Sequence, residues 1–368
     1  MRRESTLSGH GIKKILAVVA GTLVPLIGIV GVTSGSASAL PPNTLYVSTT
    51  GTDTPSCGAT PSTACATVNA AIGNAVAGDT VKVEAGHYNQ TVTIDKAIRL
   101  LGAGAGRTTL DGTGIDSSGP NYGVVYVGTT GGAVEVSGFT ITNPFPDSYT
   151  GGEPEVVALA DTNTADSVVI THNVISEGSS DVAADTDFPI GIDTFQNAAT
   201  TTISHNTVTG TFQGALLEDN GPASFANNKI KNLIAVTSDA VTYPPEGLFF
   251  LSDLSGSITG QDASHNRFSH YAGYGIIMEA GYDNGNCTDT PCNGSIAGTL
   301  ANNRLALGGA SGAIGIDLQS EFNGNDLTVN LTDNHGYVTD PSQAIVQQAT
   351  EGATISVTQT GNHIAVHP

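Results

Sequence analysis

The chain has no tryptophan, and charged residues make up only 12% of its 368 residues. Basic residues are the scarcest class: 12 Lys and Arg stand against 33 Asp and Glu, and only four basic residues follow Arg107. This balance argues against nucleic acid as a partner, because affinity for nucleic acid rests on a basic surface. It also predicts that an anionic polysaccharide is repelled unless a cation such as Ca²⁺ bridges the two. No other cofactor is implied.

Cysteine is rare and falls in two close pairs. Seven residues separate Cys57 from Cys65, and four separate Cys287 from Cys292. In an exported chain this pattern predicts two local disulfides. Metal binding is the alternative, but neither pair has the two-residue spacing of a zinc knuckle.

The first 39 residues predict export. A basic start is followed by an apolar run at 15–32 and by Ala37-Ser38-Ala39, a small-residue cleavage site. The alternative is an uncleaved anchor, because the apolar run approaches the length of a membrane span. Cleavage before Leu40 yields a secreted, extracellular chain with no membrane segment, carrying 8 basic and 32 acidic residues.

The composition that remains is typical of strands and turns. Glycine is abundant, with 46 residues, and Thr, Ser, Val, Ile and Asn fill much of the rest. Short β-branched runs such as TTISHNTV (201–208) recur with an Asn at the same place. Apolar residues stand three before and two after each Asn, so we expect both to point inward. The Asn should turn the corner, because it tolerates the left-handed conformation that a sharp bend needs, and stack on the Asn of the next coil. The Asn positions are 173, 206, 228, 266, 303, 334 and 362, with Phe139 in the equivalent slot of VEVSGFTI (134–141).

A second series of short apolar strands alternates with these corners, and most of its members open with Gly. Steps of 22 to 38 residues between corners indicate a solenoid whose loops vary in length. The expected architecture is a coil of stacked parallel strands. The strands are EVVALAD (155–161), GIDTFQ (191–196), GALLED (214–219), GLFFLSD (247–253), GIIMEAG (275–281) and GIDLQS (315–320).

The segment from Leu45 to Gly112, followed by the Asn-cornered coils, resembles secreted bacterial right-handed parallel β-helix proteins of the pectin-lyase-like superfamily. The residues that carry the resemblance are LYVSTTGTD, CATVNAAIGNAVAGDTVKVEAGHY and VTIDKAIRLLGAGAGRTTLDG. The resemblance implies an all-β right-handed parallel β-helix with a short N-terminal α-helical cap, which we place at 67–76. It predicts one domain after the signal peptide (1–39), with the cap and first coils at 40–112 and further coils at 113–368.

Alternation along the Gly-opened strands predicts a functional face. The first and third residues after each Gly are apolar and belong inside, so the second and fourth point outward. The outward set mixes carboxylates with bare apolar side chains, which indicates a covered or ligand-binding surface. We predict Glu218, Glu279, Asp317 and Asp193 as catalytic carboxylates, with Glu279 as the acid and Glu218 or Asp317 as the base. Phe195, Phe249, Tyr243 and Tyr274 are the predicted substrate-binding residues.

Three histidines precede corner asparagines: His172, His205 and His265. They are expected to be solvated turn residues. The alternative is a metal shared by His172 and His205, which would make the chain a metal-handling protein.

The predicted function is a carbohydrate-active protein that hydrolyses a neutral polysaccharide or cell-surface glycan, as a monomer. The alternative is a non-catalytic glycan-binding or structural module of the same fold. Resemblance to polygalacturonase-type hydrolases would imply NTD, DD and RIK motifs, which are absent, and a GHG motif, which occurs only at 9–11. Lyases of this fold typically need an Arg or Lys beside acidic residues, and here the cations follow the Asn corners instead. Neither chemistry therefore carries over residue by residue, and the paired carboxylates of the outer face favour hydrolysis over elimination.

Overall fold

The computed structural model describes residues 42–113, 123–142, 154–177, 188–238, 240–252, 256–281, 294–307, 313–321, 324–338, 340–350 and 352–366. The predicted signal peptide and the predicted Cys287–Cys292 disulfide lie outside these ranges. Within the described ranges, no helix combines the length and apolar character needed to cross a bilayer.

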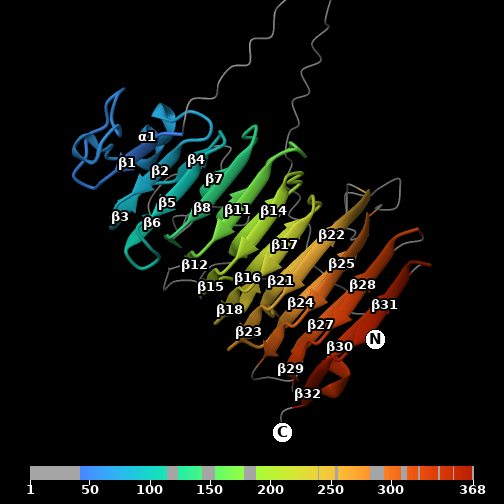
Figure 1. Ribbon diagram of the computed structural model, residues 1–368. Helices are drawn as coiled ribbons and strands as arrows, with labels where there is room; N and C mark the ends of the chain where they lie inside the picture. The colour runs from blue at the N-terminus through green and yellow to red at the C-terminus, as the bar shows by residue number, and fades with distance from the viewer. Residues whose placement is uncertain are drawn as a thin grey trace, which may run out of the picture.

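The chain winds into a right-handed parallel β-helix (Figure 1). Each coil contributes one strand to each of three long parallel sheets, visited in the order C, A, B. The predicted fold class is therefore confirmed. The regular hydrophobic periodicity explains this result, because every coil presents inward apolar residues at the same register and stacking buries them.

Sheet A has eleven strands, and its inner face is lined by aliphatic and aromatic side chains such as Ile170, Ile203 and Phe225, all fully buried. Neighbouring strands pair in strict register through most of the sheet, so Ile170 lies opposite Ile203 and Ile203 opposite Phe225. Its strands are β1 (Thr44–Val47), β2 (Thr80–Val83), β5 (Arg99–Gly102), β8 (Ala133–Ser137), β11 (Ser167–Thr171), β14 (Thr200–Ser204), β17 (Ala223–Ala226), β22 (Gly256–Ser264), β25 (Gly294–Ala301), β28 (Asp326–Thr332) and β31 (Thr354–Thr360).

Sheet B follows sheet A across the asparagine corner. Its ten strands are short, and in most of its coils the middle residue points inward, as Val208, Ile230 and Phe268 do. Its strands are β3 (Gly86–Asn89), β6 (Thr108–Asp111), β9 (Thr140–Thr142), β12 (Val174–Ser176), β15 (Thr207–Thr209), β18 (Lys229–Lys231), β23 (Arg267–Ser269), β26 (Arg304–Ala306), β29 (His335–Val338) and β32 (His363–Val366).

Sheet C has nine strands and contains the Gly-opened series. The Gly column is required by close packing: a Cβ at Gly214 would lie 2.3 Å from the carbonyl oxygen of Gly247, which belongs to the next coil. Its strands are β4 (Val92–Ile94), β7 (Gly123–Val127), β10 (Glu155–Leu159), β13 (Ile190–Phe195), β16 (Gln213–Glu218), β21 (Glu246–Ser252), β24 (Tyr274–Ala280), β27 (Ile314–Ser320) and β30 (Ile345–Ala349). A small antiparallel hairpin, β19 (Val236–Ser238) with β20 (Val241–Tyr243), leaves the coil between β18 and β21.

The predicted column of asparagines is present. The backbone N–H and Nδ2 of Asn206 both donate to Oδ1 of Asn228, at 2.9 and 3.2 Å. The Nδ2 group also donates to the carbonyl oxygen of Ile170 in the preceding coil, at 2.8 Å. The same pattern repeats along the axis, and Phe139 begins it by donating its N–H to Asn173. The ladder comprises Asn173, Asn206, Asn228, Asn266, Asn303, Asn334 and Asn362.

One detail of the corner differs from the prediction. The ladder asparagines do not adopt the left-handed conformation; the residue before each of them does, with φ of 57° at His172, 58° at His205 and 58° at Asn227. The turn therefore relies on the preceding residue, which stays at the surface. This division leaves the Asn free to bury its amide, since a buried amide is stable only when its hydrogen bonds are made.

An N-terminal cap closes the first coils, as predicted. Helix α1 spans Val68–Asn74, and the side chain of Thr67 caps it by accepting a hydrogen bond from the N–H of Ala70. The predicted Cys57–Cys65 disulfide is formed beside the cap. The expected range of 67–76 was too long: the helix stops before Ala75, so Val76 lies outside the buried face and is 57% exposed. Two short 3₁₀ turns, Pro61–Thr63 and Pro341–Gln343, complete the described elements.

Candidate functional site

The outer face of sheet C is where the predicted catalytic residues lie. Inward positions such as Ala215, Leu217 and Met278 are fully buried in the main core. The outward positions form a separate apolar cluster. This second cluster consists of Ile190, Leu216, Phe249, Leu251 and Ile277, with Tyr274 packed against it. The predicted parity of the Gly-opened strands is therefore correct, whereas β10 is offset by one residue, because Val157 pairs with the inward Ile192 and Ala158 with Asp193.

The outward side chains are much less exposed than a solvated sheet face would be. Leu216 and Glu279 are each 7% exposed, and Asp317 is 1% exposed. An ionised carboxylate loses hydration energy in such surroundings, so its neutral form is favoured. The site is an acidic cluster set beside an apolar wall.

Three carboxyl groups interact across neighbouring strands of this face. Glu279 on β24 lies diagonal to Asp317 on β27, because Ile277 pairs with Asp317 and Glu279 pairs with Gln319. Burial and then the negative charges of Glu321, Asp317 and Glu246 raise the pKa of Glu279 well above its usual range. The site therefore favours the protonated form of Glu279.

Glu246 on β21 is the third member and was missed from the sequence. Burial raises the pKa of its carboxyl group to about 7, and the charge of Asp317 contributes in the same direction. A 2.6 Å hydrogen bond from Nε2 of Gln213 to Oε2 of Glu246 partly opposes this rise. Unlike Glu279 and Asp317, Glu246 remains partly exposed. Glu246 is therefore the most accessible of the three carboxyl groups to a solute.

The position of Glu246 in its strand explains why it was not among the predicted catalytic carboxylates. The predicted outward positions are the second and fourth residues after the Gly that opens each strand, whereas Glu246 precedes Gly247. The structure aligns Gln213, Glu246 and Tyr274 in one row, and Ile190 of the same row joins the outer cluster. The polar or aromatic residue that stands directly before Gly in three successive strands was the available signal.

Two predicted carboxylates lie apart from the cluster. Leu251 separates Glu218 from Glu279, since Glu218 pairs with Leu251 and Leu251 with Glu279. The Cα atoms of the two glutamates are therefore about 10 Å apart. Asp193 lies three strands from Glu279 and two residues out of register, at about 16 Å between Cα atoms, so the structure does not bring it to the same reacting group.

The predicted aromatic residues occupy two places. Phe249, 6% exposed, and Tyr274 belong to the apolar wall, and Phe195 lies in register with Glu218. Tyr243 lies on the hairpin strand β20, where its ring makes an edge contact with Phe188 at 5.2 Å. Phe188 in turn contacts Phe212 at 4.9 Å. These three rings stand next to the Gln213–Glu246 end of the face, because Phe212 directly precedes Gln213.

The histidines at the corners do not form a shared metal site. The rings of His172 and His205 are stacked, with centroids 4.8 Å apart and planes within 1° of parallel. Ligand lone pairs lie in the ring plane, so two parallel stacked rings do not point at one ion. Among the described residues, the one group of three converging residues that could hold a metal is Asp53, Cys57 and Cys65, and the sulfur atoms of both cysteines are bonded to each other in the disulfide.

No family model and no curated protein matches this chain. Solved structures do match. An alginate lyase from Paenibacillus sp. str. FPU-7 is 14% identical, with 85% of this chain and 99% of that chain covered and a TM-score of 0.45. XylC in complex with xylose is 10% identical, with coverages of 88% and 86% and a TM-score of 0.49. Endopolygalacturonase I from Stereum purpureum is 13% identical, with coverages of 79% and 88% and a TM-score of 0.35.

The expected resemblance is one of fold. These structural neighbours are carbohydrate-active or sugar-bound proteins, and they include lyases, esterases and hydrolases. The fold of this chain rests on its own three parallel sheets and its asparagine ladder, and the reaction has to be argued from the residues of its own site.

Proposed function

We propose that this protein hydrolyses glycosidic bonds of a neutral polysaccharide on the outer face of sheet C. The observation that supports this proposal is the meeting of Glu246, Glu279 and Asp317 on three consecutive strands beside an apolar wall. Glycoside hydrolysis requires one carboxyl group that holds a proton and one that is ionised. A neutral substrate fits, because the carboxylates would repel an anionic one.

Glu279 is the proposed proton donor, because burial and the neighbouring carboxylates favour its protonated form. Asp317 is the proposed ionised partner that activates water, because Nε2 of Gln319 donates a hydrogen bond to its Oδ2 at 3.0 Å and so stabilises the charged form in spite of burial. Diagonal neighbours on adjacent strands are separated by roughly 8 Å between Cα atoms. This Cα spacing is of the same order as the roughly 6.5–9.5 Å that separates the two carboxyl groups in an inverting mechanism and leaves room for water. Glu246 contributes negative charge that favours the protonated form of Glu279.

Tyr243, Tyr274, Phe195 and Phe249 are the proposed sugar-contacting residues. Aromatic rings offer flat apolar faces that pack against the C–H face of a sugar. The partly exposed Tyr243 lies near Glu246, so we propose that the polysaccharide enters at this end of the strands.

The test is a screen of neutral glycans on an array, followed by a reducing-sugar assay on every glycan that binds. Hydrolysis should release reducing ends, and its rate should fall as pH rises and the raised carboxyl groups lose their protons. Release of unsaturated sugars, detected by ultraviolet absorbance, would show elimination instead and would overturn the hydrolytic proposal.

A non-catalytic glycan-binding module is the second candidate, and one observation favours it. Glu279 and Asp317 are 7% and 1% exposed, which restricts access to them. In this case glycan binding should be measurable by calorimetry, without release of reducing ends, and Glu279→Gln should leave the affinity unchanged.

We further propose that the protein works outside the cell as a monomer. The basic start, the apolar run and the small-residue cleavage site within residues 1–39 support export. N-terminal sequencing of protein from the culture medium should begin at Leu40; recovery of the intact N-terminus with the membrane fraction would show an anchor instead. Light scattering should give the mass of one chain.

A further inference from the structure

The basic residues of the C-terminal two-thirds of the chain lie on one face. After Arg107 the sequence contains Lys229, Lys231, Arg267 and Arg304 as its only Lys and Arg residues. All four belong to strands of sheet B, on β18, β23 and β26. They alternate with the inward Ile230, Phe268 and Leu305, so their side chains point outward.

Because neighbouring strands of sheet B pair in register, three of these residues lie in one column along the axis. Lys229 pairs with Arg267, and Arg267 pairs with Arg304. Arg304 pairs with His335, and His335 pairs with His363. The column therefore presents one basic side chain per coil over five consecutive coils, at a spacing of about 4.8 Å along the axis. We call these five residues the basic column.

The basic column is exposed and carries no compensating acid. All five of its residues are exposed, and no salt bridge involves them in the described part of the chain. From β9 to β32 the sheet B strands contain no Asp or Glu. The nearest acidic corner residue is Asp333, two positions before His335. This face is therefore basic, although the chain as a whole is acidic and contains 33 Asp and Glu residues.

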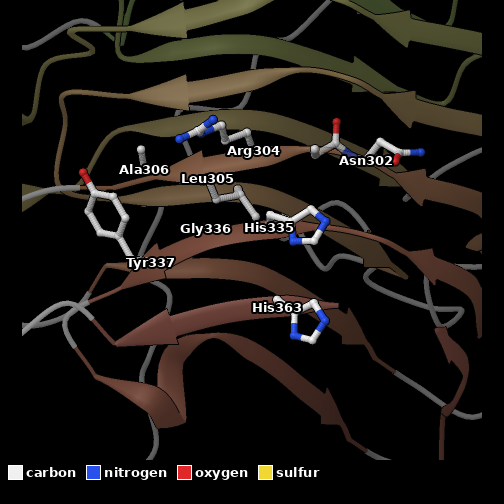
Figure 2. Close-up of a pocket in the computed structure, with 9 residues that line it drawn as sticks. Asn302, Arg304, Leu305, Ala306, His335, Gly336, Tyr337 and His363 are labelled. Carbon is white, nitrogen blue, oxygen red and sulfur yellow. The ribbon is translucent and has the colours of Figure 1, made fainter. Parts of the chain in front are cut away.

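A groove lies at the C-terminal end of the same face. It has a volume of about 470 Å³. Figure 2 shows the guanidinium of Arg304 and the ring of Tyr337 toward one end of the strands, and the imidazoles of His335 and His363 one beyond the other toward the corner. The two imidazoles are nearly parallel, 18° apart, with centroids 5.6 Å apart. The groove therefore combines positive charge with flat rings.

We propose that the basic column and its groove bind a linear anionic polysaccharide that lies along the axis of the β-helix. An extended chain with a charged group on successive sugars matches a surface with one basic group per coil. Arginine suits such groups, because its planar fork donates two parallel hydrogen bonds to an oxyanion. Tyr337 and the two imidazoles would pack against sugar rings. This site lies on a different sheet from the proposed hydrolytic site and does not depend on it.

A glycan fits the column better than nucleic acid does. Double-stranded DNA carries a negative charge about every 1.7 Å along its axis, far denser than the column. The acidic remainder of the protein would repel such a polymer. A polysaccharide with one charge per sugar is less dense and meets fewer of these repulsive charges.

The experiment measures binding of the full chain to fluorescent dextran sulfate, with uncharged dextran as the backbone-matched control. Binding is followed by anisotropy at low salt and again at about 0.5 M NaCl, where screening shortens the range of electrostatic attraction to a few ångströms. The dextran sulfate is a lightly substituted one with a mean of one sulfate per glucose, which matches the proposed charge density. We expect it but not dextran to bind, with at least tenfold weaker binding in Arg267→Gln/Arg304→Gln. The matched control is Lys82→Gln/Arg107→Gln, which removes the same charge from two exposed residues of the first coils and should change the affinity less than twofold.

Three outcomes would overturn the proposal. Equal losses in the two double variants would show non-specific attraction. Absence of dextran sulfate binding at low salt would show that the column binds no such chain. Tighter binding of single-stranded DNA than of dextran sulfate would show the wrong polymer class. Thermal melting of both variants checks folding, and Glu279→Gln should bind dextran sulfate as the parent does, which separates this site from the hydrolytic one.

Discussion

The outer faces of sheets B and C are built by the same coils, yet they have opposite character. On sheet C the outward residues are buried, apolar and acidic, and Glu279 is 7% exposed. On sheet B the outward residues are exposed and basic, from Lys229 to His363. In a parallel β-helix a residue type repeated at one register position becomes a continuous stripe. The residue type at each register position therefore determines the charge and polarity of each face, and neither can be inferred from the net charge of the chain.

The largest expected effect concerns the acidic face. Glu279→Gln keeps the size of the side chain and removes the proton that the mechanism requires. Turnover of a neutral glycan should fall roughly 10²–10⁴-fold, as measured by the reducing-sugar assay. Glu84→Gln, the same change at an exposed residue after β2, is the control and should retain parental turnover. Parental turnover in Glu279→Gln would place the reaction elsewhere on the molecule.

The asparagine ladder borders the basic column of sheet B, because each residue of the column directly follows a ladder Asn. Asn266→Ala removes the acceptor for the N–H and Nδ2 of Asn228 and the donor to the carbonyl of Phe225. Leaving such buried groups unsatisfied should lower the free energy of unfolding by roughly 2–5 kcal/mol. Chemical denaturation measures it. Asn302→Ala, at the exposed position before Asn303, is the comparison and should cost less; an equal cost would show that burial of the amide is unimportant.

The pH dependence of stability sharpens the contrast between buried and exposed acids. The pKa values of Glu246, about 7, and Glu279 are raised in the folded state. Folding therefore favours their protonated forms, and this contribution is present at low pH and lost as pH rises through the folded pKa values. Between about pH 5 and pH 8 the parent should lose on the order of 1–3 kcal/mol relative to Glu246→Gln. Denaturation at the two pH values measures this, and Glu84→Gln should follow the parent. If the free energy of unfolding of Glu246→Gln changed with pH as much as that of the unsubstituted protein, burial would not raise the pKa of Glu246.

The smallest expected effect lies at the corners. His205 has a φ of 58°, a conformation that costs an L-residue roughly 1–2 kcal/mol. Asn tolerates this conformation better than most residues, and Asn227 occupies the equivalent position one coil on. His205→Asn should therefore change the melting temperature little, whereas His205→Val should lower it by several degrees. Similar melting temperatures for the two variants would show that the corner is not strained.

The repeat was predictable because it is periodic and local. The spacing of the asparagines and their flanking apolar residues gave the coil, the ladder and the inward parity of Met278 and Leu217. The left-handed residue was misplaced by one position, because His and Asn both tolerate that conformation and the sequence does not show which amide is buried. Glu246 was missed because an irregularity at Gly247 places both Glu246 and Phe249 on the outer face.

Long-range register accounts for the rest. The sequence shows that Lys229, Arg267 and Arg304 follow corner asparagines, but the total charge predicted repulsion of any anionic glycan. Only pairing across 31 to 38 residues shows that these side chains, together with His335, form one stripe. The proximity of Glu321 to Glu279 depends in the same way on a turn that follows β27.

The asparagine ladder makes the coil, and not the single residue, the natural unit of insertion and deletion. Asn206 and Asn228 are 22 residues apart, so excision of residues 206–227 would join His205 directly to Asn228 and recreate a Ser-His-Asn corner. Strands β15, β16 and β17 would be lost together, one from each sheet. Neither the strands that carry Glu246, Glu279 and Asp317 nor those of the basic column would be cut. A lineage of such chains can therefore lengthen or shorten by whole coils while both faces persist, and the distance between them and the N-terminal cap changes in steps of one coil.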